Sequence, residues 1–279
     1  MLSLCLAVFS SAMVSIVMRI SSGHIKHNLG MLTMNYIVCA LLAGFFGGFR
    51  GAFDLSSPQV GLTLAMGTVN GFLYLAGFVL MQMNIRKNGV VLSSIFQKLG
   101  LLVTLVISVV FYREIPDLMQ GCGFIIALAA IVLMNYQKGS GGVGSRGALL
   151  AMLLSCGLGD AMAKVFTESG VAALESQFLL YTFGVAMGLC FVLMTLNGQK
   201  IGLREALFGT LIAVPNFFSS KFLLGALESL SAVIVYPVFS VGTILVVTLA
   251  GVLAFRERLT GRQWTGVAAI LAALVLLNI

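Results

Sequence analysis

The sequence predicts an all-α polytopic membrane protein in which ten transmembrane helices form two inverted five-helix repeats. Three observations predict this fold: an apolar composition, ten apolar runs, and a repeat that relates the two halves. Of the 279 residues, 59% are hydrophobic and 9% are charged, whereas soluble domains carry about 25% charged residues. So few charged side chains cannot cover a soluble domain, which excludes a soluble enzyme and a nucleic-acid-binding protein. A lipid bilayer is the solvent that this composition fits.

Ten apolar runs are each long enough to cross a bilayer. A transmembrane helix needs about 20 mostly apolar residues, and Arg, Lys, Gly, Pro and Asn separate the runs. The predicted spans are residues 2–21, 30–49, 58–84, 89–112, 117–136, 146–167, 175–196, 204–227, 229–254 and 261–278. The connections between them are short, so we expect the function to reside within the membrane.

The second half of the chain repeats the first. Residues 113–135 align without a gap on residues 256–278, with 10 of 23 positions identical. The polar identities are Arg113 with Arg256, Glu114 with Glu257, Gln120 with Gln263 and Asn135 with Asn278. We therefore predict one repeat in residues 1–137 and a second in residues 146–279, joined by a glycine-rich linker. Since each copy has five spans, the second enters from the opposite side, as in alternating-access transporters.

The repeated segments also resemble a known family. FYREIPDLMQGCGFIIALAAIVLMN and AFRERLTGRQWTGVAAILAALVLLN each carry an Arg-Glu pair and a Q-x-x-G helix that ends in L-x-N. This pattern resembles the drug/metabolite transporter (DMT) superfamily, EamA type, over essentially the whole chain. The resemblance implies a ten-helix bundle with a central cavity and a small organic solute as cargo. It also implies a basic residue late in the first helix of each half, where Arg19 and Lys164 stand.

Four charged side chains lie more than two residues from the ends of their predicted spans, and a charge at mid-helix costs about 2.5–3.5 kcal/mol. Lys98 lies near the middle of its span. Asp160 and Lys164 are four residues apart, so they share a helix face and are predicted to neutralise each other. Lys98 and Lys221 then leave a positive bias that favours a carboxylate or phosphate on the cargo. The competing interpretation is that both lysines snorkel or contact backbone carbonyls.

Polar and aromatic residues at helical spacing complete the candidate site. The candidate substrate-binding residues are Tyr36, Asn70, Tyr74, Ser93, Gln97, Lys98, Asp160, Lys164, Tyr181, Asn216, Ser220, Lys221, Tyr236 and Ser240. The tyrosines could stack on a ring and donate a hydrogen bond, although polar residues are also the usual contacts between membrane helices. Pro215 and Pro237 lie inside spans and either free backbone carbonyls near the site or simply kink the helices.

No enzyme motif stands out in the sequence. It contains no P-loop, HExxH or Asp-rich metal motif. We therefore predict no catalytic residue, no metal and no cofactor. Glu114 and Glu257 follow arginines at helix ends and are read as salt-bridged caps. The expected partners are a small-molecule substrate, the lipid bilayer and coupled protons carried by Asp160, or a second solute in exchange, but no nucleic acid.

Together these features predict a secondary transporter that moves a small organic metabolite or drug-like solute, amino-acid-like or anionic, by alternating access. An uptake carrier for a sugar-like or phosphorylated solute, a lipid flippase or scramblase, and a non-transporting scaffold are the alternatives. We expect an integral multi-pass protein of the cell membrane. The distribution of Lys and Arg over the loops places both termini outside, whereas the family resemblance implies cytoplasmic termini.

Overall fold

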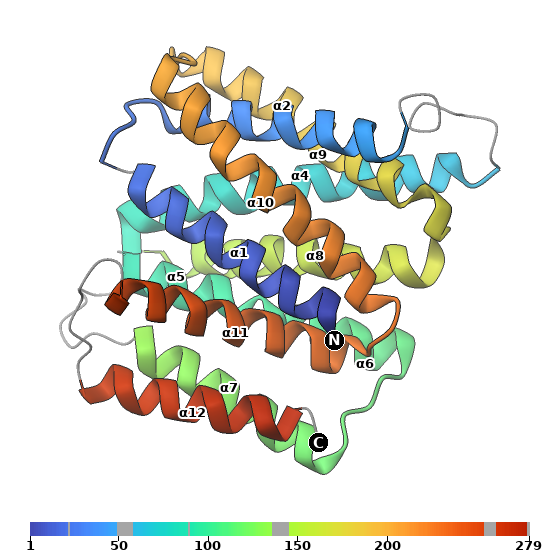
Figure 1. Ribbon diagram of the computed structural model, residues 1–279, viewed down its shortest axis with the longest axis vertical. Helices are drawn as coiled ribbons and strands as arrows, with labels where there is room; N and C mark the ends of the chain where they lie inside the picture. The colour runs from blue at the N-terminus through green and yellow to red at the C-terminus, as the bar shows by residue number, and fades with distance from the viewer. Residues whose placement is uncertain (22, 49–57, 89, 136–144, 254–260, 278–279) are drawn as a thin grey trace.

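The computed structural model describes residues 1–21, 23–48, 58–88, 90–135, 145–253 and 261–277, and these ranges contain helices but no strand. The helices are α1 (Leu2–Ser21), α2 (Asn28–Phe46), α4 (Val60–Asn88), α5 (Val90–Leu99), α6 (Leu101–Tyr112), α7 (Leu118–Asn135), α8 (Arg146–Ser169), the 3-10 helix η1 (Ala172–Leu174), α9 (Glu175–Leu196), α10 (Leu203–Leu227), α11 (Ala232–Leu253) and α12 (Gly261–Leu277). Helices α5 and α6 together form one span. The predicted ten-helix membrane fold is therefore confirmed (Figure 1).

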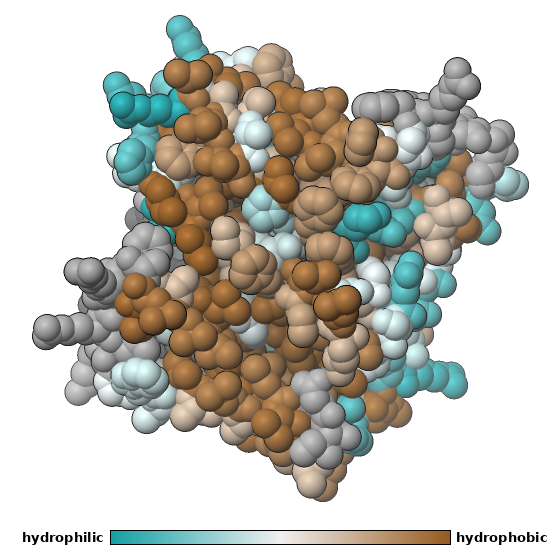
Figure 2. Space-filling model, viewed as in Figure 1, coloured by the Kyte–Doolittle hydropathy of each residue, from teal (hydrophilic) through white to brown (hydrophobic). Residues whose placement is uncertain are grey.

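The outer surface of the bundle is apolar, as a bilayer requires. Seven helices in the described part of the chain are individually long and apolar enough to span a membrane, and three further apolar helices are shorter. Large apolar side chains point outward, with Leu118 84% and Leu203 90% exposed. Figure 2 shows this apolar surface across the middle of the face, with hydrophilic residues concentrated towards the ends of the helices. The chain is thus an integral multi-pass protein of the cell membrane.

Each of the main contacts between helices of different halves has an equivalent contact with the roles of the two halves exchanged. Helix α1 packs on α10 as α8 packs on α4, and α2 packs on α10 as α9 packs on α4. Equivalent helices that touch run antiparallel. In the α2–α9 pair, Thr33 bonds Cys190 while Gly47 approaches Ser176. In the α7–α12 pair, Gly123 near the start of α7 meets Leu276 near the end of α12. Two oppositely oriented copies of one unit would make these pairings.

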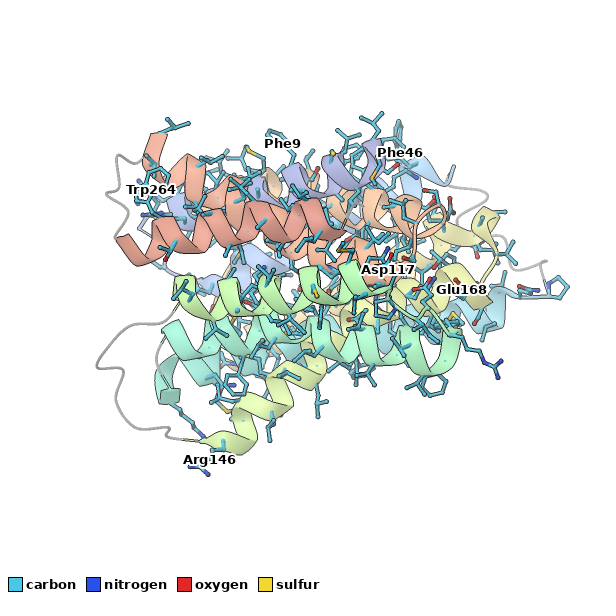
Figure 3. All side chains as sticks on the ribbon, turned by 90° about the horizontal axis from the view of Figure 1, so that it is seen from below. Phe9, Phe46, Asp117, Arg146, Glu168 and Trp264 are labelled. Atoms are coloured by element: carbon cyan, nitrogen blue, oxygen red, sulfur yellow. The ribbon has the colours of Figure 1, made fainter. Side chains whose placement is uncertain are left out.

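Two ends of the bundle can be distinguished. The near end holds Met1, the α6–α7 connection (residues 113–117) and the α10–α11 connection (residues 228–231). The far end holds the α1–α2 and α9–α10 connections, which are tied together by Glu205. Its carboxylate accepts the backbone N–H groups of Lys26 at 2.9 Å and of the next residue at 3.2 Å. Figure 3 places Asp117 at the near end and Arg146 at the other.

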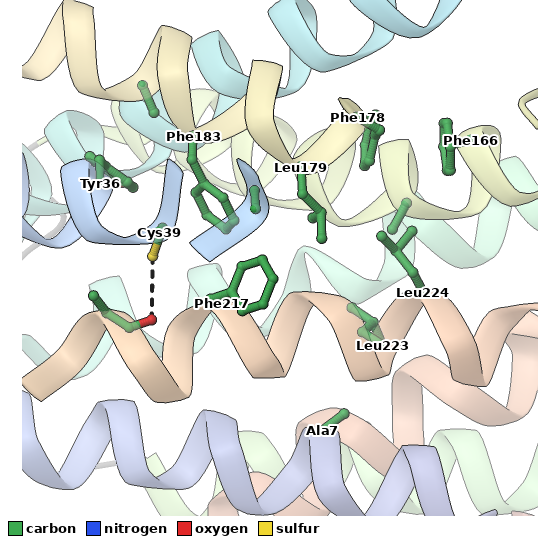
Figure 4. Packing of buried hydrophobic residues seen from close by; sticks show 14 of the residues in the cluster. Ala7, Tyr36, Cys39, Phe166, Phe178, Leu179, Phe183, Phe217, Leu223 and Leu224 are labelled. Carbon is green, nitrogen blue, oxygen red and sulfur yellow. Dashed lines mark hydrogen bonds between the residues drawn. The ribbon is translucent and has the colours of Figure 1, made fainter. Parts of the chain in front are cut away.

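Aromatic side chains fill the core between the halves. The largest buried cluster includes Phe178, Phe183 and Phe217, each 1% exposed, together with Tyr36 (Figure 4). Cys39 joins this cluster and donates to the backbone carbonyl of Ala213 at 3.4 Å. The core is therefore built by α2, α9 and α10, which belong to different halves, so the halves pack against each other through it.

One span is interrupted, and the interruption lies at a glycine rather than at either proline. Helices α10 and α11 continue through Pro215 and Pro237, whereas the fourth span is divided at Gly100. There the backbone of α8 comes so close at Gly157 that a Cβ on Gly157 would collide with the Gly100 carbonyl oxygen. Thr104 Oγ1 donates to the Gly157 carbonyl at 3.0 Å beside this contact. Close packing of two glycines thus lies at the level at which the fourth span is interrupted.

This contact generates a stability prediction. Gly157→Ala is expected to lower the free energy of unfolding by about 1–3 kcal/mol, because its Cβ would displace the Gly100 backbone and the Val103 side chain. Gly147→Ala on the same helix is the matched control, since a Cβ at Gly147 meets nothing within 4 Å. Because alanine favours helix, the control should be neutral or slightly stabilising. Thermal unfolding in detergent measures both, and equal melting temperatures would contradict the packing argument.

Candidate functional site

Two opposite charges face each other at mid-depth in the bundle. Lys98 lies near the end of α5, just before the interruption at Gly100, and Asp160 lies near the middle of α8. Their charges interact electrostatically, but at a longer range than the direct ion pairs formed elsewhere in the described chain. Each side chain keeps partial exposure. Neither charged group is therefore taken up by a direct ion pair within the bundle.

Aromatic and hydroxyl groups surround this charge pair. The Tyr236 hydroxyl donates to the backbone carbonyl of Asp160 at 2.6 Å. Tyr74 lies within hydrogen-bonding reach of Ser220 and within electrostatic reach of Asp160. The ring of Phe183 stacks between Tyr74 and Tyr36, with centroid distances of 6.3 Å and 6.4 Å. The charge pair is thus surrounded by stacked aromatic rings and hydroxyl groups.

Both halves of the chain build this cluster. Helices α2, α4 and α5 of the first half contribute Tyr36, Tyr74 and Lys98, and helices α8, α10 and α11 of the second half contribute Asp160, Ser220 and Tyr236. These are six of the predicted site residues. We call this set, with Phe183, the central cluster. A cluster assembled from two halves can change shape when the halves move relative to each other.

The predicted asparagines contact neighbouring helices instead. Asn70 Nδ2 donates to Thr182 Oγ1 at 3.4 Å across the α4–α9 contact. Asn216 Nδ2 donates to Asn35 Oδ1 at 3.3 Å across the α10–α2 contact, which is the equivalent contact of the other half. Asn70 also has a buried Oδ1 without a hydrogen-bond partner in the described structure. Both amides therefore join helices next to the central cluster.

The predicted Asp160–Lys164 neutralisation is replaced by other partners. Lys164 is 2% exposed and binds Glu114 at 2.7 Å and Glu168 at 2.5 Å. Its Nζ also lies 5.6 Å from the centroid of the Tyr112 ring. Two carboxylates compensate this lysine, which leaves Asp160 to face Lys98. Glu114 likewise binds Lys164 rather than capping its own helix, because Arg113 ends α6 in the left-handed conformation.

Lys221 also has a carboxylate partner. Its Nζ lies 3.5 Å from Glu175 Oε1 at the start of α9 and 5.8 Å from the centroid of the Phe46 ring. The Lys221 side chain is 30% exposed, and its partner Glu175 stands in the first turn of α9. The positive bias expected from Lys98 and Lys221 is therefore offset, because each lysine faces an acidic group.

The remaining predicted residues lie at the edges of the site or in helix contacts. Tyr181 packs its Cβ against α4 at Gly67. Ser93 is fully buried, and Gln97 and Ser240 are half-buried. The repeat partner of Glu114, Glu257, lies outside the described residues. Sequence reasoning missed Phe183 and Asn35, of which only Asn35 gives a signal, as a polar residue in an apolar span.

Known proteins resemble this chain in sequence and in fold. Residues 1–136 match the model of the EamA-like transporter family. An uncharacterized protein of Haemophilus influenzae is 24% identical over 287 residues, which cover 98% of this chain and 96% of that protein. A solved structure, described only as the crystal structure of a protein, superposes with a TM-score of 0.75 at 14% identity and covers 100% of this chain and 97% of the other. The structural likeness supports the fold and is silent on the cargo.

The two paired lysines differ in a way that stability measurements can detect. Lys164→Ala is expected to cost about 3 kcal/mol of unfolding free energy, since it leaves two carboxylates uncompensated around a buried position. Lys221→Ala removes one partly exposed pair and is expected to cost about 0–1 kcal/mol. Thermal unfolding in detergent compares the two. If both variants lose the same unfolding free energy, the burial of Lys164 does not determine how much its ion pairs stabilise the protein.

Proposed function

Because residues 1–136 match the model of the EamA-like transporter family, a family of transporters, we propose that the chain is a secondary transporter of this family. It moves a small organic solute across the cell membrane by alternating access, and the solute binds at the central cluster. The observation that carries this proposal is the Lys98–Asp160 pair at mid-depth between the halves. Intramembrane charges are costly and mark substrate or ion pathways.

The chemistry of the central cluster favours a solute with both an amine and a carboxylate. Lys98 can bind a carboxylate and Asp160 can bind an ammonium group, while the half-buried Tyr74 offers an apolar ring that is backed by the buried rings of Phe183 and Tyr36. A purely anionic, phosphorylated or lipid headgroup cargo needs an excess of positive charge. Asp160 offsets Lys98, so an amino-acid-like solute fits this site better.

The arrangement of the halves supports the transport mechanism. Helices α2 and α9 run antiparallel, as do α7 and α12, which fits oppositely oriented repeats in residues 1–137 and 146–279. Rocking of one repeat against the other would expose the cluster to each side in turn. Asp160 is also the group that would carry a coupled proton, because it is a carboxyl group near the middle of α8 that forms no direct ion pair in the described structure.

A ligand screen tests the proposed solute class. Purified protein is heated with amino acids, with the matching amines and with the matching carboxylic acids, since a ligand that binds the folded state raises its melting temperature. The proposal expects stabilisation by compounds that carry both groups. Stabilisation by phosphorylated solutes alone would contradict it. Uptake of the best compound into proteoliposomes then measures transport.

Removal of either charge should abolish transport without unfolding the protein. Lys98→Ala and Asp160→Asn are each expected to lower the transport rate by about 30-fold or more, the effect of losing one charged contact with the solute. The melting temperature should stay close to that of the wild type, since neither group forms a direct ion pair in the described structure. Thr210→Ala is the control, since Thr210 is exposed and its hydroxyl donates to the backbone carbonyl of Ala206 in its own helix. Unchanged uptake by Lys98→Ala would exclude Lys98 from the site.

A further inference from the structure

A second charged contact lies one helical turn from the central cluster, towards the near end. Glu114 Oε1 accepts a hydrogen bond from Lys164 Nζ at 2.7 Å, and Glu114 Oε2 accepts the backbone N–H of Ala232 at 2.8 Å. One carboxylate thus joins the α6–α7 connection to α8 and to the first residue of α11. We propose that this contact, the Glu114 bridge, is the latch that holds the near end of the transport pathway closed. The inference rests on the proposed function.

The bridge joins the two halves of the chain. Glu114 belongs to the first half, whereas Lys164 and Ala232 both belong to the second. A movement that opens the near end by separating the halves must therefore break both contacts of this one side chain. Hydrogen bonds to charged groups are stronger than neutral ones, so their loss sets a substantial part of the cost of opening.

The bridge is also connected to the central cluster. Asp160 and Lys164 are four residues apart on α8, and Ala232 and Tyr236 are four residues apart on α11, so each pair shares a helix face. The Tyr236 hydroxyl donates to the Asp160 carbonyl. Helices α8 and α11 are thus hydrogen-bonded to each other at the level of the central cluster. One turn closer to the near end, Glu114 binds both helices. The latch holds the helices that carry the solute-binding groups.

The ion network allows the latch to open reversibly. Lys164 is 2% exposed, so its charge needs a partner in every state. Glu168 supplies that partner from α8 itself, and its side chain is 41% exposed. When Glu114 leaves, Lys164 keeps Glu168, and no charge is stranded. Glu114 acts across the halves, whereas Glu168 acts within one helix.

This difference provides a matched pair of variants. Glu114→Ala removes the contact between the halves, and Glu168→Ala removes a carboxylate from the same lysine while the bridge remains. Cys156 is the reporter, since its charge interactions with Lys98 and Asp160 place it at the central cluster. Cys5 and Cys122 are exposed and are replaced by serine, whereas Cys39 and Cys190 are fully buried.

Modification of Cys156 by a charged, membrane-impermeant thiol reagent measures the opening of each end. The reagent is added to either side of oriented proteoliposomes. From the near-end side, Glu114→Ala is expected to raise the rate by about tenfold or more, as loss of one charge-assisted hydrogen bond predicts. Glu168→Ala should leave the rate unchanged. An unchanged modification rate in Glu114→Ala overturns the proposal. A rise in Glu168→Ala as large as that in Glu114→Ala also overturns it, because the effect would then come from the charge of Lys164 and not from the contact between the halves.

A second variant keeps the test decisive if Glu114→Ala does not fold. Glu114→Gln retains an oxygen that can accept the Ala232 N–H and loses the ion pair with Lys164. It should raise the near-end rate by a smaller factor, and no rise overturns the proposal. The assay uses no solute, so its outcome is separate from that of the transport assay. If the protein transports the solute but the Glu114 variants leave the Cys156 modification rates unchanged, the Glu114 bridge is not the latch, and the proposed function still holds.

Discussion

A charged side chain inside a bilayer needs an opposite charge or water beside it, and this requirement organises the described bundle. Lys164 has two carboxylates, Lys221 has Glu175, and Lys98 faces Asp160. Lys98 and Asp160 differ from the other two sets. They lie at mid-depth, both side chains are partly exposed, and they form no direct ion pair in the described residues. The other lysines are compensated by the protein itself. The free energy of burying charge therefore identifies which pair can respond to a solute.

Close backbone contacts determine where these charges stand. Gly157 of α8 meets Gly100, which places Lys98 on the turn before the interruption of the fourth span. On the other face of α8, Gly77 of α4 meets Cys156. Small residues let three spans approach around Asp160 without bulky side chains between them. The close glycine contacts thus determine how near the helices that carry Lys98 and Asp160 lie to each other.

The sequence was a good guide to the fold and a partial guide to the site. Apolar runs of membrane length predicted the helices closely, because the bilayer imposes their length and composition on the chain itself. The partners of the lysines were harder to predict, since Glu114 and Lys164 are separated by 50 residues. The i,i+4 spacing of Asp160 and Lys164 suggested a local pair, but a tertiary contact prevailed. Phe183 carries no polar signal, and only its position between two tyrosines reveals it.

The central claim is that the two halves rock about the charge pair, and distances between spin labels test it most directly. One label pair spans the far end, at Lys26 and Arg146, and another spans the near end, at Asp117 and Ser229; all four side chains are exposed. Pulsed electron paramagnetic resonance compares each distance with and without the stabilising solute. Our account predicts that one distance lengthens while the other shortens. Two distances that stay fixed, or that change in the same direction, would contradict it.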